Sequence, residues 1–225
     1  MHATPDAPRA SSAPRPIRVW DLPTRLFHWL LAVLVVFSFV TAKVGGSWTA
    51  WHFYSGYAIL TLLVFRVLWG FAGNRYARFA GFVRGPRAVM AYVRGRTTVA
   101  GHSPLGALSV LLVLAALILQ AVTGLFTSDD IASEGPLFKL VSGETGALIG
   151  RLHRWNEKVL IALVALHLVA VLFYQWDRHR DLIRPMFSGD QRHPGLPGSD
   201  DALLRWRAAV LFAVAAGLVG WVVNL

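Results

Sequence analysis

The chain has 225 residues, of which 55% are hydrophobic and only 15% charged. Soluble domains are about 45–50% apolar and about 25% charged, so this composition argues against a soluble globular enzyme and against disorder over most of the chain. The formal charge of +10 would suggest nucleic acid in a soluble protein. Here the basic residues cluster in particular loops, which indicates membrane topology instead, and we expect no nucleic-acid partner. The absence of cysteine excludes disulfides, iron–sulfur clusters held by this chain and covalently attached haem.

Five apolar runs are long enough to cross a membrane, since a spanning helix needs about 20 mostly apolar residues. Each run is continuous rather than alternating, which favours helices over a barrel. The runs are Leu26–Ala42, Trp51–Phe71, Pro104–Phe126, Leu148–Tyr174 and Trp206–Val223. The sequence therefore predicts an all-α integral membrane protein, embedded in the lipid bilayer.

The loops differ sharply in charge, and this difference predicts the orientation. Arginine is concentrated in the N-terminal segment, in the second-to-third connection and in the fourth-to-fifth connection, which share one side if there are five spans. The other side carries Lys43 and an acidic loop with Asp129, Asp130, Glu134 and Glu144. The positive-inside rule places the arginine-rich side in the cytoplasm. We expect a multi-pass protein with a cytoplasmic N-terminus and a C-terminus on the outer, periplasmic side.

Four of the eight histidines lie in or at the edge of a predicted span, where a polar side chain is costly and needs a reason. His28 lies toward the cytoplasmic side and His52 toward the outer side. His153 and His167 are 14 residues apart on the fourth span, which is about 21 Å along the axis and about 40° short of four turns. One helix therefore presents two imidazoles at two depths. Each has a partner at a similar depth, His52 with His153 and His28 with His167.

Two such pairs suit two stacked haem b groups. A b-type haem takes two axial imidazoles on opposite faces of its macrocycle, held between helices in an apolar cavity. Its face also needs room, which glycine provides by lacking a side chain. Gly56 lies one turn after His52, and Gly106 and Gly124 lie in the third span near the two levels. Small residues also serve ordinary helix packing, so the histidines are the main evidence.

Haem propionates need cations, and three arginines are candidates. Arg25 lies one turn before His28, while Arg151 and Arg154 flank the first histidine of the fourth span. Topology or snorkelling to the interface would explain these arginines equally well. The outer two are the better signal because their side otherwise lacks positive charge. His102, just before the third span, is a candidate for a propionate contact, a quinone contact or a replacement ligand.

Two other functions compete with this interpretation. A metal-ion transporter would use the same histidines, but transporters usually need carboxylates or a polar path as well. No aspartate or glutamate lies deep in a predicted span. A purely structural membrane anchor would leave the histidines unexplained.

Five stretches of the chain carry a resemblance to a known protein family: VWDLPTRLFHW (19–29), HFYSGYAIL (52–60), RVLWGFAG (66–73), GHSPLGALSV (101–110) and LHRWNEKVLIALVALHLVAVLF (152–173). With them the chain resembles the prokaryotic cytochrome b561 family, including the cytochrome b subunits of nickel–iron hydrogenases and related dehydrogenases. The resemblance implies a four-helix transmembrane bundle in the bacterial inner membrane that holds two haem b groups. It implies the same four axial ligands, His28, His52, His153 and His167. It also implies electron transfer between membrane quinone and a partner redox protein, such as a dehydrogenase or hydrogenase subunit.

The expected organisation has four parts. They are a disordered tail over 1–20, a four-helix cytochrome b domain over 21–187, a linker over 188–204 and a fifth, C-terminal transmembrane helix over 205–225. The chain has no second redox motif and no nucleotide-binding glycine pattern. We therefore expect an electron-transfer subunit of a membrane oxidoreductase without catalytic residues of its own. A self-contained quinol:acceptor oxidoreductase is the alternative.

Overall fold

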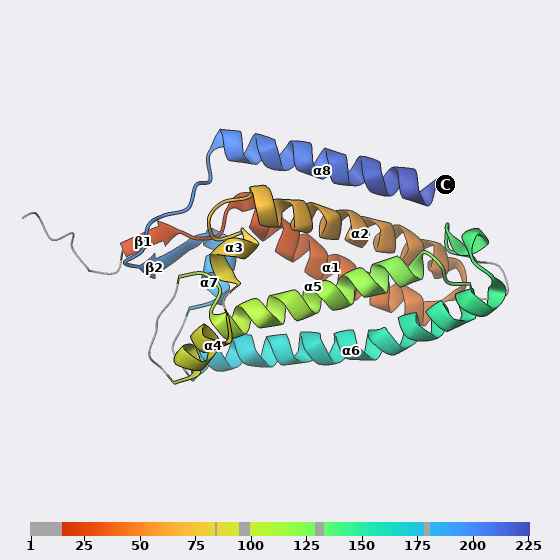
Figure 1. Ribbon diagram of the computed structural model, residues 1–225, viewed down its shortest axis with the longest axis horizontal. Helices are drawn as coiled ribbons and strands as arrows, with labels where there is room; N and C mark the ends of the chain where they lie inside the picture. The colour runs from red at the N-terminus through yellow and green to blue at the C-terminus, as the bar shows by residue number, and fades with distance from the viewer. Residues whose placement is uncertain (1–14, 84, 95–99, 129–132, 178–180) are drawn as a thin grey trace, which may run out of the picture.

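Five long helices dominate the computed structural model, which describes residues 15–83, 85–94, 100–128, 133–177 and 181–225. They are α1 (Leu22–Val44), α2 (Thr49–Ala72), α5 (Pro104–Gly124), α6 (Gly143–Trp176) and α8 (Ala202–Val223). All five run along the long axis of the molecule (Figure 1). Each is long and apolar enough to cross a membrane, so the prediction of five helical spans is confirmed.

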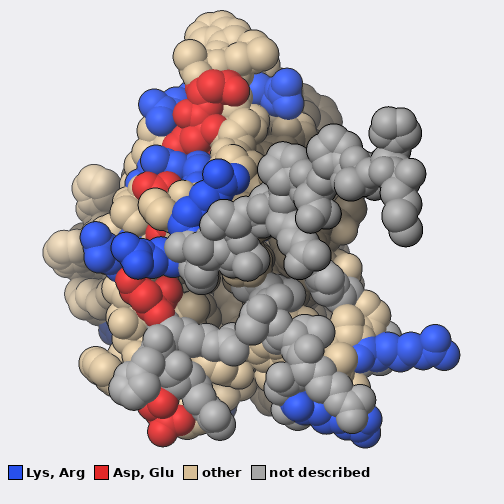
Figure 2. Space-filling view, turned by 90° about the vertical axis from the view of Figure 1, so that its left-hand side faces the viewer, with Lys and Arg blue, Asp and Glu red and all other residues tan. Residues whose placement is uncertain are grey.

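Short elements connect the spans at the two ends of the molecule. One end holds the strands β1 (Arg15–Arg18) and β2 (Asp190–His193) and the helices α3 (Phe79–Phe82), α4 (Pro86–Val93) and α7 (Ile183–Ser188). The other holds the 3₁₀ helices η1 (Gly46–Trp48) and η2 (Phe138–Leu140). The three arginine-rich segments meet at the first end, which we call the arginine-rich end. Figure 2 looks onto this end and shows basic side chains with acidic ones among them. Asp129 and Asp130 of the expected acidic loop lie outside the described residues.

Side-chain caps fix where four of the spans begin. The free amides of a helix's first turn need acceptors, and aspartate and serine supply them at the N-cap. The caps are Asp21, Ser103, Ser142 and Asp201, which accept from the amides of Thr24, Gly106, Thr145 and Leu204 at 2.7, 3.1, 3.3 and 2.8 Å. Because these starts are fixed, the depths of His28 on α1 and of His153 and His167 on α6 follow from the sequence.

Helix α2 forms the centre of the bundle. It packs along α1, and it also contacts α5 and α8, while α5 packs along α6. Trp69 and Leu63 of α2 are almost fully buried, in one cluster with Leu117 of α5 and Ala215 of α8. Helices α1 and α6, in contrast, make at most isolated contacts over the described residues. Helix α6 is therefore held to the bundle mainly through α5.

The expected tail and linker differ from the prediction, because parts of both are ordered against each other. Residues 15–18 and 190–193 form an antiparallel ribbon in which Arg15 lies opposite His193 and Arg18 opposite Asp190. These polar segments find their backbone partners in one another across the length of the chain, a pairing that no local sequence pattern reveals. The rest of the tail, residues 1–14, lies outside the described residues.

Asp200 joins this ribbon to the starts of two spans. Its Oδ1 accepts from the Leu22 amide at 3.2 Å and from Arg205 Nε at 3.1 Å, and its Oδ2 lies 3.3 Å from Arg18 Nη1. Burial alone would raise the pKa of Asp200. The hydrogen bonds from Arg205 and Leu22 and the charges of Arg205 and Arg18 outweigh burial and hold that pKa below its ordinary value. The carboxylate thus fastens α1 and α8 to the arginine-rich end.

Candidate functional site

His52 and His153 face each other near the end opposite the arginine-rich one. His52 lies in the first turn of α2 and His153 in the N-terminal part of α6. Their ring centroids are 6.3 Å apart and their planes cross at 85°. Two imidazoles bound to one metal ion need a similar separation between their ring centroids. Two metal–nitrogen bonds of about 2 Å each, plus the distance from each nitrogen to the centre of its ring, add up to about 6 Å. We call these two residues the outer pair.

Backbone carbonyls of neighbouring helices orient both rings of the outer pair. His52 Nδ1 donates to the Ser38 carbonyl of α1 at 2.9 Å, and His153 Nδ1 donates to the Gln120 carbonyl of α5 at 3.0 Å. A carbonyl oxygen only accepts, so the proton of each neutral ring lies on Nδ1. The other nitrogen, Nε2, then keeps the lone pair that a metal ion needs, which is the usual arrangement of a ligating histidine.

A small amide network lies beside His153. Its Nε2 is 3.0 Å from Gln120 Nε2, and Gln120 Oε1 accepts from Asn156 Nδ2 at 2.7 Å. Asn156 is buried and also donates to the Ala116 carbonyl at 2.9 Å. A metal ion bound to His153 Nε2 would take the place of the Gln120 amide, whose side chain extends from α5.

Two glycines lie beside the outer pair, one in contact with a ring and one with open space next to it. A Cβ at Gly124 would lie 3.1 Å from His153 Cε1, closer than nearly all such contacts, so glycine lets the ring take this position. A Cβ at Gly56, one turn after His52, would meet no atom within 4 Å, so there is open space beside that ring. The donor set and this space both suit a haem.

His28 and His167 form the second pair, nearer the arginine-rich end, and we call them the inner pair. They come from the start of α1 and the middle of α6 and lie close enough to interact electrostatically. His28 Nδ1 is buried and has no hydrogen-bond partner among the residues that the structure describes. The edge of the Trp29 ring lies against His28, with 4.9 Å between ring centroids.

His102 lies next to the inner pair and is only partly exposed. Its ring is between Trp20 and Phe82, with centroid distances of 4.7 and 4.5 Å. Burial, together with the charge of Arg66 and the proximity of His28, lowers the pKa of His102 to about 3. The imidazole is therefore neutral at physiological pH, and its Nδ1 is buried without a partner in the described part of the chain.

Arg66 was not among the residues predicted from the sequence. It belongs to α2 and is only 3% exposed, although it carries a permanent charge. A sequence signal for it exists, because Arg66 follows His52 by 14 residues, as His167 follows His153. By the same helical arithmetic, Arg66 lies on nearly the same face of α2 as His52, at the level of the inner pair.

Arg25, one of the predicted propionate contacts, has partners elsewhere. Its Nη1 donates to the Phe187 carbonyl of α7, and its Nη2 lies 3.9 Å from Asp200 Oδ2. Its guanidinium thus contributes to the attachment of α1 at the arginine-rich end. Only its Nε is buried without a partner.

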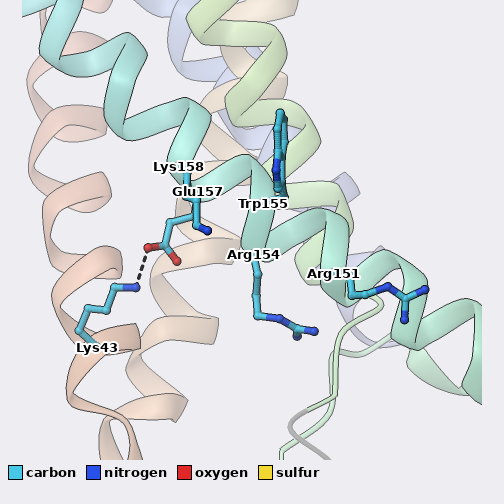
Figure 3. A pocket seen from close by; sticks show the side chains of 6 residues that line it. All are labelled: Lys43, Arg151, Arg154, Trp155, Glu157 and Lys158. Carbon is cyan, nitrogen blue, oxygen red and sulfur yellow. Dashed lines mark hydrogen bonds and ion pairs between the residues drawn. The ribbon is translucent and has the colours of Figure 1, made fainter.

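Arg151 and Arg154 line an open pocket of about 420 Å³ on the outer part of α6, together with Lys43, Trp155, Glu157 and Lys158 (Figure 3). Lys43 Nζ and Glu157 Oε1 form an ion pair of 2.6 Å that connects the end of α1 to α6. Figure 3 shows Arg151 and Arg154 extending from α6 apart from this pair. Both are exposed at the level of the outer pair, where a carboxylate could be bound.

No group of three or more histidine, aspartate or glutamate side chains comes together to hold a metal ion within the described ranges. The histidines occur as two pairs, each at its own depth. A model of the prokaryotic cytochrome b561 family matches residues 19–189, a segment that contains both pairs, His102 and Arg66.

The chain belongs to the prokaryotic cytochrome b561 family. It is therefore a multi-pass membrane cytochrome of the b type, which binds haem b and takes part in electron transfer. No curated protein and no solved structure matches the chain. Helix α8 lies beyond the matched segment and packs on the outside of the four-helix core, against α2.

Proposed function

We propose that this cytochrome binds two haem b groups and carries electrons across the membrane between the quinone pool and a partner redox protein. His52 and His153 are the axial ligands of an outer haem, and His28 and His167 are those of an inner haem. The two histidines of α6 are 14 residues apart, about 21 Å along the helix. The two sites therefore lie at different depths, as transfer across a bilayer requires.

The geometry of the outer pair is the observation that best supports this proposal. Its rings are 6.3 Å apart, and both Nδ1 atoms are engaged by backbone carbonyls. Histidines with a merely structural role would not need two facing imidazoles at a ring separation suited to one iron, each with its proton held on Nδ1. For the inner pair, the support is the proximity of two imidazoles and the unsatisfied Nδ1 of His28.

The protein's contribution is to hold, orient and shield the haems. Haem iron supplies the reversible uptake and release of one electron. The Ser38 and Gln120 carbonyls keep the outer imidazoles in one tautomer and one orientation. Apolar helices around both pairs exclude water, which lowers the local dielectric constant and so tunes the redox potential.

The distribution of charge supports an orientation for this transfer. The arginine-rich end faces the cytoplasm by the positive-inside rule, so the N-terminus is cytoplasmic and the C-terminus periplasmic. The outer pair and the basic pocket of Arg151 and Arg154 then face the periplasm. The inner pair and His102 lie toward the cytoplasmic leaflet of the bacterial inner membrane.

A count of haem and iron in the purified protein tests the proposal. Protein produced with ample haem should give a haem b spectrum in the pyridine haemochrome assay, with two haems and two irons per chain. One haem per chain would mean that only one pair binds haem. No haem at all would overturn the proposal, and histidine-dependent metal transport would then be the leading alternative.

A further inference from the structure

Within the described part of the chain, the buried polar atoms without a hydrogen-bond partner lie in one half of the bundle. Five buried side-chain atoms lack a hydrogen-bond partner over the described residues, and all five belong to residues of the arginine-rich half. They are Asp21 Oδ2, Arg25 Nε, His28 Nδ1, Arg66 Nη1 and His102 Nδ1. A buried polar group without a partner costs free energy, so this half of the bundle is built to receive a polar ligand.

Arg66 has the greatest need of such a ligand. Its guanidinium stays charged at any physiological pH, and it is 3% exposed within a membrane-spanning helix. The guanidinium lies over the Phe79 ring, 4.9 Å from its centroid, and 6.0 Å from that of Phe82. Aromatic faces stabilise a cation only modestly, and a buried charge needs an opposite charge. Among the residues that the structure describes, no carboxylate forms an ion pair with Arg66.

Asp21, the acidic residue that interacts with Arg66 electrostatically, does not meet this need. It is fully buried, and its Oδ1 is already used to cap α1 by accepting from the Thr24 amide at 2.7 Å. Its other oxygen, Oδ2, makes no hydrogen bond to Arg66 or to any other described residue, and burial raises the pKa of Asp21. His102, the other polar neighbour, is an imidazole and supplies no negative charge. The missing partner of Arg66 is therefore an anion from outside the described protein.

The position of Arg66 indicates which anion this is. On α2 it is 14 residues from His52, which places it at the depth of the inner pair. His102 interacts electrostatically with both Arg66 and His28, so the three lie in one neighbourhood. Haem b carries two propionate carboxylates, and Arg25, the cation expected to bind them here, is engaged by Phe187 and Asp200.

We infer that Arg66 binds a propionate carboxylate of the inner haem. The inference rests on the proposed function, because it requires a haem held by His28 and His167. A quinone would accept a hydrogen bond from Arg66, but it is neutral and would leave the buried charge uncompensated. A carboxylate supplies both the acceptor and the charge, which is why it is the better fit.

The test compares Arg66→Met and Arg66→Lys in a His52→Ala background, which keeps only the inner haem. The measured quantity is the rate of haem transfer to excess apomyoglobin, once with haem b and once with its dimethyl ester, which has no carboxylate. Loss of a buried ion pair should speed the release of haem b at least about tenfold in Arg66→Met, and Arg66→Lys should restore much of the difference. With the dimethyl ester, the His52→Ala parent and the two Arg66 variants should release haem at similar rates, because the ion pair between Arg66 and the propionate cannot form.

A second readout separates this role from a purely structural one. In the haem-free full chain, Arg66→Met should not lower the unfolding temperature, since the substitution removes an uncompensated buried charge. In the haem-bound protein, the same substitution should lower the unfolding temperature. If Arg66 had only a structural role, Arg66→Met would lower the unfolding temperature of both the haem-free and the haem-bound protein. Arg207→Met is the matched control, because Arg207 is an exposed arginine at the same end that donates to the Ala72 carbonyl, and it should leave the haem release rate unchanged.

The outcomes distinguish failure of the inference from failure of the proposed function. If His52→Ala removes no haem or both haems, the proposed pairing is wrong. If His52→Ala keeps one haem, and adding Arg66→Met does not change the rate of haem b release from the His52→Ala protein, Arg66 does not bind a propionate. If in addition more quinol is needed for half-maximal haem reduction, the site holds a quinone, and the inference is overturned in favour of that ligand.

Discussion

Ser38 and Gln120 orient the outer pair through their backbone carbonyls, on helices other than those that carry the histidines. Such acceptors survive side-chain substitution, so the orientation of His52 and His153 depends on how α1 and α5 pack. The inner pair is different, because His28 Nδ1 has no acceptor among the described residues and lies in a group of unsatisfied atoms. The two pairs therefore differ in polarity, and the two haems that we propose should differ in redox potential.

His102 should not be an axial ligand, because each proposed pair is complete without it. We expect His102→Ala to retain two low-spin haems, measured by optical and electron paramagnetic resonance spectra of the purified protein. His193→Ala is a suitable control, since that side chain lies in the ribbon and accepts from the Gly195 amide. Loss of one low-spin haem in His102→Ala alone would make His102 a ligand and displace one member of the inner pair.

The sequence is sufficient to place the four histidines along their helices, because hydropathy and helical spacing are local properties, while their role as haem ligands stays a prediction. It does not predict which polar atoms are buried. Arg66 near the end of a span resembles an ordinary snorkelling arginine. It is buried because Phe79 and Phe82 of α3 fold back over it. Arg25 has the expected position, but its guanidinium is engaged by residues of the distant α7 and linker segments.

At the scale of elements, the spans could be predicted and the ribbon could not. Each span is an uninterrupted apolar run, which can be recognised from the local sequence alone. The strands β1 and β2 are short, polar and separated by most of the chain. No periodic pattern in the sequence predicts that they pair. The same holds for Asp200, whose partners Arg18, Leu22 and Arg205 come from three separate elements.

Asp200→Asn should weaken the attachment of α1 and α8, and the effect should depend on pH. The pKa of Asp200 is below its ordinary value of 3.8, so the stability that its charge adds is fully present above that value. It is lost as the pH falls through the lower pKa of the folded protein. We expect a lower unfolding temperature for Asp200→Asn at neutral pH, and a difference from wild type that shrinks in acid.

Asp190→Asn provides the comparison for this prediction, since Asp190 forms a more exposed ion pair with the same arginine, Arg18. Exposed pairs contribute little to stability, so the effect of Asp190→Asn should be smaller. Thermal unfolding of both variants and the wild type in one detergent, over a series of pH values, measures this. A loss of stability in Asp200→Asn that is independent of pH would show that the charge of Asp200 is not what fastens the helices.

At the scale of the whole molecule, the histidines come from helices that barely touch. The inner pair joins α1 to α6, which make at most isolated contacts over the described residues, and the outer pair joins α2 to α6. At the outer end the Lys43–Glu157 ion pair also bridges α1 and α6. A haem held between such helices would bridge them, so haem binding should complete the packing of the four-helix core.

The most direct test of this account is the pairing of the histidines, measured by spectroscopic redox titration of His28→Ala, His52→Ala, His153→Ala and His167→Ala. Wild type should titrate as two haem components with different midpoint potentials. His52→Ala and His153→Ala should lose the same component, and His28→Ala and His167→Ala should lose the other. If substitutions within one proposed pair remove different components, or if both components survive any one of them at full occupancy, the two-site assignment is contradicted.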